Sequence, residues 1–281
     1  MRKTKILVTG YWITGILVTG FSTNAQYYYK DMVSNKQLLD EMARLKEQKL
    51  RSVSIKSFDD DGSLSDGFFC EKNISRNYGT VETLTKSNVT GATWFTSLFN
   101  KNGQLLKTTD SSQIAVSTVV YDYDEKNRIK SIRSGQRSSD DDFTNEMMEE
   151  HIYQYTDGGT LQKMIRVKNY RDSSQILFSL DDKNNISIEK DTKSGKSYYY
   201  YYDNKNRLTD VVHFNQFNEK MLPDYIFEYN GAGQVAQMTT TEEGGSYYYI
   251  WKYTYENELR TGERCFSKEK RLMGSIQYEY K

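Results

Sequence analysis

The sequence predicts an all-β fold: an antiparallel β-hairpin repeat array, in a twisted or curled open sheet, with one short N-terminal capping helix. The chain of 281 residues contains 24 Tyr and 12 Phe but one Pro. Aromatic side chains favour strands and Pro disfavours them, so this composition is typical of β-sheet. A seven-residue turn pattern recurs along most of the chain, and one amphipathic stretch precedes it.

The charge balance excludes some classes of protein before any motif is considered. Lys and Arg number 38 and Asp and Glu number 38, so the formal net charge is zero. A broadly basic protein that binds nucleic acid is not expected from this balance. The mean hydropathy is −0.79, yet the high aromatic content argues against a disordered chain.

Residues 1–25 have the pattern of a secretory signal peptide. A positively charged start precedes an uncharged, mostly apolar stretch over 6–21. This stretch is short and weakly apolar for a membrane span, which is the alternative interpretation. Thr23 and Ala25 are small residues at positions −3 and −1 of a cut before Gln26.

The junction at this cut is similar to those of exported proteins from Bacteroidetes-type bacteria. We therefore expect an exported chain that is periplasmic, on the cell surface or secreted. After cleavage, no stable membrane span is expected.

One amphipathic helix is predicted within 26–52, a region of helix and linker. Ser34 followed by Gln37 is the signature of a capping box at a helix start. Apolar residues then recur at helical spacing to about Gln48. We expect this apolar stripe to cover an exposed end of the β-domain at 53–281, because repeat arrays need such caps.

The repeat is a seven-residue template. It consists of a large apolar residue, Asp or Asn, two free positions, Gly or Asn, a free position and an aliphatic residue. Tyr123 to Ile129 and Tyr202 to Leu208 match it nearly identically. The fifth, structural turn position is Gly or Asn in every match: Gly62, Gly103, Asn127, Gly159, Asn184, Asn206 and Gly233.

The spacing has a physical explanation. Asp at the first position of a type I turn can accept a hydrogen bond from the backbone two residues later. The last turn residue must then be left-handed, which Gly and Asn tolerate, and a hairpin with a G1 bulge results. The links between hairpins vary in length, so one edge of the sheet is expected to be uniform and the other ragged. A decayed unit is expected around Asn77 to Gly79.

The template, with a Tyr two residues before it, resembles the tyrosine–aspartate (YD) repeats of the rearrangement-hot-spot family. The resemblance is clearest at Tyr121 to Ile129 and at Tyr200 to Leu208. It implies an array of antiparallel hairpins, which in that family can wind into a shell around a toxin domain. This chain departs from the family because it has few units and no toxin-sized extension. Only the hairpin array is therefore carried over.

Strand alternation gathers aromatic residues on one face of the array. Most could simply pack against their neighbours on the sheet, and the alternative is a platform for sugar rings or a partner protein. The candidate binding face consists of Tyr121, Tyr123, Tyr153, Tyr155, Tyr200, Tyr202, Tyr229, Tyr247, Tyr249 and Trp251.

Residues that would carry chemistry are sparse. No nucleophile elbow, P-loop or zinc-protease motif occurs. His151 and His213 are predicted as half-exposed strand residues. We expect no catalytic residue, no metal and no cofactor, and the chain is not predicted to be an enzyme. Cys70 and Cys265 would lie at opposite ends of an open sheet and could not bond there, although a closed barrel would allow it.

Two functions are compatible with these features. The first is an exported, non-enzymatic repeat protein that presents a Tyr-rich face to a cell-envelope protein or glycan. The alternative is an orphan shell or immunity component of a toxin-delivery system. A hydrolase with a scattered active site ranks third.

Overall fold

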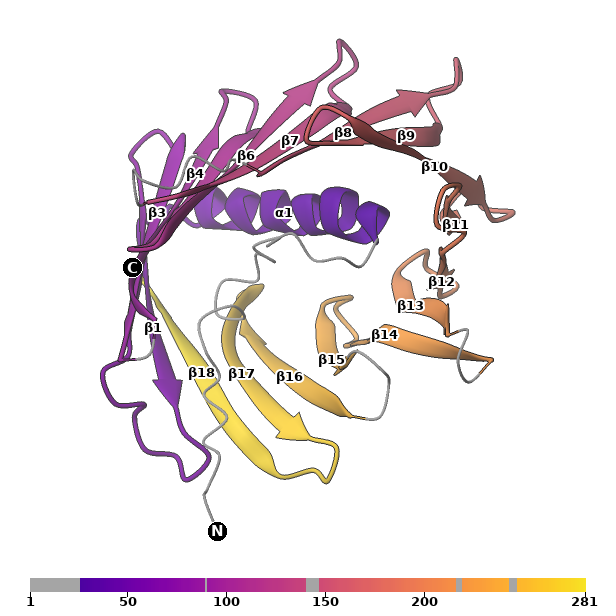
Figure 1. Cartoon of the computed structure of the whole chain (residues 1–281). Helices are drawn as coiled ribbons and strands as arrows, with labels where there is room; N and C mark the ends of the chain where they lie inside the picture. The colour runs from indigo at the N-terminus through magenta and orange to yellow at the C-terminus, as the bar shows by residue number, and fades with distance from the viewer. Residues whose placement is uncertain (1–25, 89, 140–146, 216–218, 243–246) are drawn as a thin grey trace.

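The computed structural model describes residues 26–88, 90–139, 147–215, 219–242 and 247–281. It contains one antiparallel sheet of 18 strands. β1 (Ser52–Phe58) pairs on one side with β2 (Phe69–Ile74) and on the other with β18 (Leu272–Tyr280). The first and last strands are therefore neighbours, and the sheet is a closed barrel (Figure 1). The predicted open array is wrong.

Every strand pairs with those before and after it in the chain. The intervening strands are β3 (Thr80–Ser87), β4 (Gly91–Phe99), β5 (Leu105–Ser111), β6 (Ala115–Tyr123), β7 (Ile129–Ser138), β8 (Met147–Tyr155), β9 (Leu161–Lys168), β10 (Asp172–Leu180), β11 (Ile186–Asp191), β12 (Ser197–Tyr202), β13 (Leu208–Asn215), β14 (Lys220–Tyr229), β15 (Val235–Thr241), β16 (Tyr248–Glu256) and β17 (Leu259–Ser267).

Closure has a physical reason that the repeat pattern does not contain. An open sheet leaves a row of unpaired N–H and C=O groups on each edge strand, and closing the ring pairs both rows. At the seam, Val53 lies opposite Tyr280 and Lys56 lies opposite Gln277. Lys56 also forms an ion pair with Glu279 on the outer face.

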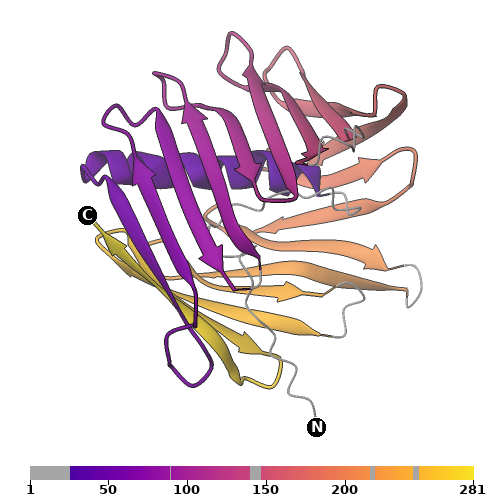
Figure 2. The same cartoon turned by 60° about the vertical axis from the view of Figure 1, so that its left-hand side comes forward.

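The N-terminal segment runs through the interior of the barrel. It forms a π-helix, η1 (Tyr28–Val33), that continues into α1 (Ser34–Glu47). Figures 1 and 2 show the helix enclosed by the ring of strands. It does not cap an exposed end, as the sequence had suggested, because a closed sheet has no such end. The Ser34 hydroxyl donates to the carbonyl of Tyr29 rather than forming a capping box.

Two apolar clusters join the helix to the inner face of the sheet. Met42 and Leu45 of α1 pack with Val53, Ile55 and Leu105 near the seam. The aromatic side chains of η1 pack against the middle strands in a second cluster. None of the helices in the described ranges is long and apolar enough to cross a membrane.

The two ends of the barrel differ. We call the end that carries the turns β4–β5, β6–β7, β8–β9, β10–β11, β12–β13, β14–β15 and β16–β17 the tight rim, and the opposite end the ragged rim. The turn between Ile74 and Thr80 also lies on the tight rim, where the decayed unit was expected, and the Tyr78 N–H closes it on Ser75. The first template match, which begins at Phe58, lies instead on the ragged rim, because three strands separate it from the next match.

The template turns share one geometry. All seven fifth-position residues have positive φ, from 58° at Asn206 to 88° at Gly159. Asp203 shows how the turn is held, since its Oδ1 accepts hydrogen bonds from the N–H groups of Lys205 at 2.9 Å and Arg207 at 3.0 Å. At each template turn of the tight rim, the register shifts by one residue just before the turn, as between Tyr201 and Tyr202.

Closure does not produce a disulfide. Cys70 and Cys265 are both buried and free. They lie on β2 and β17, with β1 and β18 between them. Three strand spacings amount to about 14 Å, whereas a disulfide needs Cα atoms within about 7 Å.

Candidate functional site

The predicted aromatic face lies inside the barrel. Tyr153, Tyr200 and Trp251 are 4%, 2% and 5% exposed. Tyr121, Tyr123, Tyr155, Tyr202 and Tyr229 pack on the same inner cluster while remaining partly accessible. Tyr247 and Tyr249 are half-buried where β15 and β16 meet the ragged rim. The structure therefore places these ten residues on one face, and that face surrounds the N-terminal segment.

At the tight rim, the tyrosines that come just before a turn join neighbouring hairpins. Each hydroxyl donates to the carbonyl of the aliphatic residue that follows the turn of the preceding hairpin. The pairs are Tyr123 to Leu105, Tyr155 to Ile129, Tyr202 to Ile186, Tyr229 to Leu208 and Tyr255 to Val235, at 2.7–2.9 Å. A role in packing therefore accounts for these template tyrosines.

An arginine at the sixth position of two template units strengthens the same junction. Arg207 forms an ion pair with Asp203 at 2.6 Å, and its guanidinium lies 4.3 Å from the centre of the Tyr229 ring. Hydrogen bonds from Arg207 hold the pKa of Asp203 at about 2. Arg128 repeats this arrangement between Asp124 and Tyr155.

In the middle of the barrel, the N-terminal segment covers the aromatic face. The rings of Tyr28 and Tyr200 meet edge to face, with centroids 5.1 Å apart. Tyr29 lies 4.7 Å from the Tyr225 ring and 5.8 Å from that of Phe227. The middle of the aromatic face is therefore occupied by aromatic side chains of the protein's own N-terminal segment.

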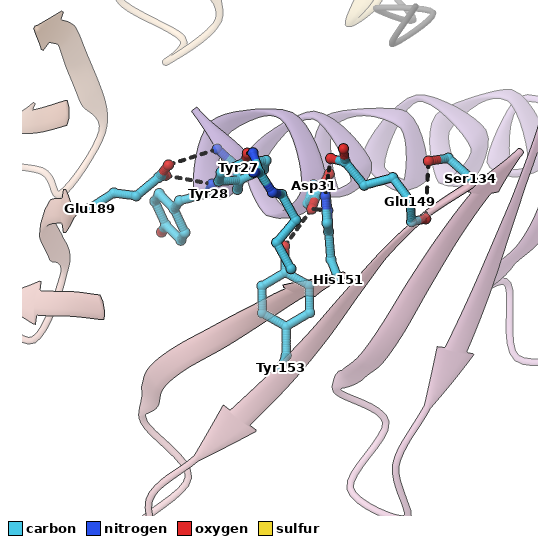
Figure 3. Close-up of polar contacts among 9 residues, drawn as sticks. Tyr27, Tyr28, Asp31, Ser134, Glu149, His151, Tyr153 and Glu189 are labelled. Carbon is cyan, nitrogen blue, oxygen red and sulfur yellow. Dashed lines mark hydrogen bonds and ion pairs between the residues drawn. The ribbon is translucent and has the colours of Figure 1, made fainter. Parts of the chain in front are cut away.

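A buried polar cluster fixes the segment in place (Figure 3). His151 on β8 lies between two carboxylates, with Nδ1 2.5 Å from Asp31 Oδ2 and Nε2 2.9 Å from Glu149 Oε1. The Tyr153 hydroxyl donates to the same Asp31 oxygen at 2.5 Å. Asp31 belongs to η1 and the other residues to the wall, so His151 links the segment to the barrel.

The charge state of His151 follows from this geometry. Burial alone would lower its pKa, but Asp31 and Glu149 outweigh burial and raise the pKa to about 9. The ring is therefore an imidazolium at neutral pH, and it donates to both carboxylates. The sequence had suggested a half-exposed residue. The side chain is in fact 11% exposed, whereas that of His213, paired with Asp224, is 31% exposed.

Glu189 on β11 holds the beginning of the segment. Its carboxylate accepts hydrogen bonds from the N–H groups of Tyr27 at 3.0 Å and Tyr28 at 2.9 Å, and from the Tyr200 hydroxyl at 2.8 Å. The residue is fully buried. Burial raises its pKa, and the nearby charge of Asp31 acts in the same direction.

In the part of the chain that the structure describes, the Tyr247–Tyr249 pair belongs to neither of the two apolar clusters that contact the helix. The two ring centroids lie 5.5 Å apart in an edge-to-face arrangement. The Tyr247 hydroxyl donates to Glu269 at 2.9 Å and the Tyr249 hydroxyl donates to Glu242 at 3.1 Å. The carboxylates therefore orient two rings at the mouth of the barrel.

The polar cluster offers little for catalysis. Asp31, His151 and Glu149 are bonded to one another and buried, so no ring nitrogen is left to act on a substrate. In the part of the chain that the structure describes, no group of three or more His, Cys, Asp or Glu side chains could hold a metal ion.

Sequence reasoning did not assign a role in holding the segment to Asp31, Glu149 or Glu189. A signal for one of them was present, because Glu149, His151 and Tyr153 alternate along one strand and so share a face with the Tyr-rich surface. No such signal marked Asp31 or Glu189, because Asp31 binds His151 at a separation of 120 residues and Glu189 binds the segment at separations of 161–162 residues.

Comparison with known proteins gives no family. No protein-family description matches the chain, and neither does any curated protein. Among solved structures, 83% of the chain aligns with 14% of the TcdB2-TccC3 chain, at 13% identity and a TM-score of 0.36. A porin-like protein from Bacteroides uniformis aligns over 83% of this chain and 98% of its own, at 8% identity and a TM-score of 0.39. A porin-like protein from Bacteroides vulgatus is similar at 13% identity and a TM-score of 0.30.

Proposed function

We propose that this chain is an exported, non-enzymatic binding protein that binds a cell-envelope glycan on Tyr247 and Tyr249 at the ragged rim. One observation carries the proposal: the N-terminal segment occupies the middle of the aromatic face and leaves this pair at the surface. The tight-rim tyrosines are engaged in joining hairpins. The site is thus placed on the pair that serves neither to hold the segment nor to join hairpins at the tight rim.

The chemistry of the pair suits a sugar. A sugar ring has an apolar face that can lie against an aromatic ring and hydroxyl groups around its edge. Glu242 and Glu269 hold the two phenol groups, and an ionised carboxylate has further acceptor sites for sugar hydroxyls. Trp251 lies two residues after Tyr249 on the same face of β16 and is buried.

The non-enzymatic part of the proposal rests on the buried cluster. Its imidazolium lies between the carboxylates of Asp31 and Glu149, and the Glu189 carboxylate accepts hydrogen bonds from the backbone of the segment. A general base needs access to the proton that it removes. These groups have a clear structural role, which is to retain the helix.

A glycan array and an extract of the cell envelope test the proposal. The folded chain is expected to bind glycans, and Tyr247→Ala with Tyr249→Ala is expected to abolish binding. Tyr248→Ala is the matched control, because Tyr248 lies on the same strand but points to the opposite face. A blank array and a protein captured from the extract through the same two tyrosines would replace the glycan by a protein partner. No binding in either assay contradicts the proposal.

The enclosed helix favours a second candidate, the orphan shell or immunity component of a toxin-delivery system. A barrel that shields a segment of its own chain has the enclosing property of a shell. A toxin or secretion cassette beside the gene would favour this candidate over glycan binding.

A further inference from the structure

The beginning of the N-terminal segment lies inside the barrel. Cleavage of the predicted signal peptide would make this buried beginning the new N-terminus of the chain. Gln26 is 4% exposed and Tyr27 is 8% exposed. The Gln26 carbonyl already accepts the first helical hydrogen bond, from the N–H of Lys30 at 2.9 Å. The cut predicted before Gln26 would therefore place a free α-amino group at the start of a buried helix.

Glu189 is a buried carboxylate at this same point. Its contacts come from two backbone N–H groups and one phenol. Lys30 lies close enough to act on Glu189 electrostatically, while His151 is held by Asp31 and Glu149 and Arg166 donates to the Tyr27 hydroxyl. Burial nevertheless raises the pKa of Glu189, because taking a carboxylate out of water is costly to a fold. A further positive charge beside this carboxylate therefore stabilises the folded chain.

We propose that cleavage before Gln26 completes the structure, because the new α-ammonium group pairs with the Glu189 carboxylate and fixes the N-terminal segment in the barrel. Consecutive Cα atoms are about 3.8 Å apart, so the Gln26 nitrogen lies one residue from the Tyr27 N–H that Glu189 already binds. A carboxylate that binds the first backbone N–H groups of a chain is placed to bind its terminal amine as well. The inference depends on the export step of the proposed function, although not on the glycan.

The same geometry sets an order of events. Gln26 and Tyr27 are buried, and the segment that follows is helical from Tyr28 onward. A peptidase needs access to an extended chain on both sides of the bond that it hydrolyses. Cleavage therefore precedes entry of the segment into the barrel, and the uncut precursor lacks the ion pair.

The test compares two forms of the chain. One starts at Gln26 and the other retains Thr23-Asn24-Ala25, which displaces the ammonium group from Glu189. Mass spectrometry verifies that the Gln26 amine is free and uncyclised. At pH 7, the unfolding equilibrium constant of the form that starts at Gln26 is expected to be lower by about tenfold or more, which corresponds to the interaction that shifts a pKa by one unit.

Two variants show whether Glu189 is responsible. Glu189→Gln keeps the shape of the side chain and is expected to remove the difference between the two forms. If that variant does not fold, acetylation of the Gln26 amine is expected to bring the shorter form to the stability of the longer one. Equal stability of the two unmodified forms overturns the inference, and so does a difference that survives Glu189→Gln or acetylation.

The export step is tested separately. N-terminal sequencing of the chain recovered from an exporting host is expected to start at Gln26. A start at Met1 contradicts export itself. A start at Gln26 together with equal stability of the two forms contradicts only the ion pair.

Discussion

The tight rim and the polar cluster around the N-terminal segment are held together over very different distances along the chain. At the tight rim, Asp203 binds Arg207 four positions away, and Tyr229 reaches the hairpin that precedes it. In the cluster, Asp31 binds His151 at a separation of 120 residues. The tight rim therefore depends on many similar contacts between residues close in the sequence. The polar cluster depends on a few long-range contacts, none of which is repeated elsewhere in the cluster. Mutations in the two regions should differ accordingly.

The largest expected effect is in the cluster. His151→Ala leaves Asp31 and Glu149 buried without their shared cation, and removing one partner of a buried ion pair costs about 3–5 kcal/mol. Equilibrium unfolding in urea measures the loss. His213→Ala is the matched control, because the His213–Asp224 pair is more exposed and should cost less than about 1 kcal/mol. Equal losses in the two variants would remove the distinction between the regions.

The pH dependence of stability probes the same cluster. The pKa of His151 is about 9 in the folded chain, against about 6.5 for an ordinary imidazole. A raised pKa means that the stabilisation is fully present below about pH 6.5 and is lost as the pH rises to about 9. The expected loss is about 3 kcal/mol. His151→Ala should flatten the curve over this range, and an unchanged curve in that variant would contradict the assignment.

A single tight-rim turn should matter less. Gly103 has a φ of 79°, and a Cβ there would meet no atom within 4 Å. Gly103→Ala therefore costs only backbone strain, about 1–2 kcal/mol. Asn127→Gly, at the equivalent position with a φ of 62°, is expected to leave the denaturant midpoint unchanged or slightly raised. A neutral Gly103→Ala would show that the left-handed conformation is not required.

The smallest expected effect is the loss of one hydroxyl between hairpins. Tyr229→Phe removes the 2.7 Å hydrogen bond to Leu208 and keeps the ring under Arg207, at a cost of about 1 kcal/mol. Tyr201→Phe is the control on the outer face, where the side chain is 50% exposed, and it should change stability by less than about 0.5 kcal/mol. A larger loss at Tyr201 than at Tyr229 would argue against the hydroxyl as the link between hairpins.

The contrast also explains what the sequence could predict. The turns are local, so an Asp or Asn followed at a fixed spacing by a Gly or Asn was enough to predict the bend at residues such as Gly103 and Asn206. The uniform rim followed from constant turn lengths. Closure was missed because the alternation of inward and outward side chains along the strands of Val53 and Tyr280 is the same in an open sheet and in a closed ring. Only the pairing of the two ends separates the two folds.

The position of the helix inside the barrel was missed for a related reason. In the sequence, Asp31 precedes the predicted capping helix and Glu41 lies within it, and both look like solvent-facing charged residues. Their partners, His151 and Lys72, lie on distant strands and become neighbours only after closure. The buried cluster therefore could not be predicted before the barrel itself.

Amide hydrogen exchange on the first and last strands tests the closed barrel most directly. Closure predicts that β1 and β18 are protected to the same degree as β12 and β13, because each has hydrogen-bonded neighbours on both sides. In an open sheet, each of these two strands would have an unpaired edge. Rapid exchange of alternate amides along β1 and β18, with β12 and β13 still protected, would contradict the closed barrel and with it the enclosed helix.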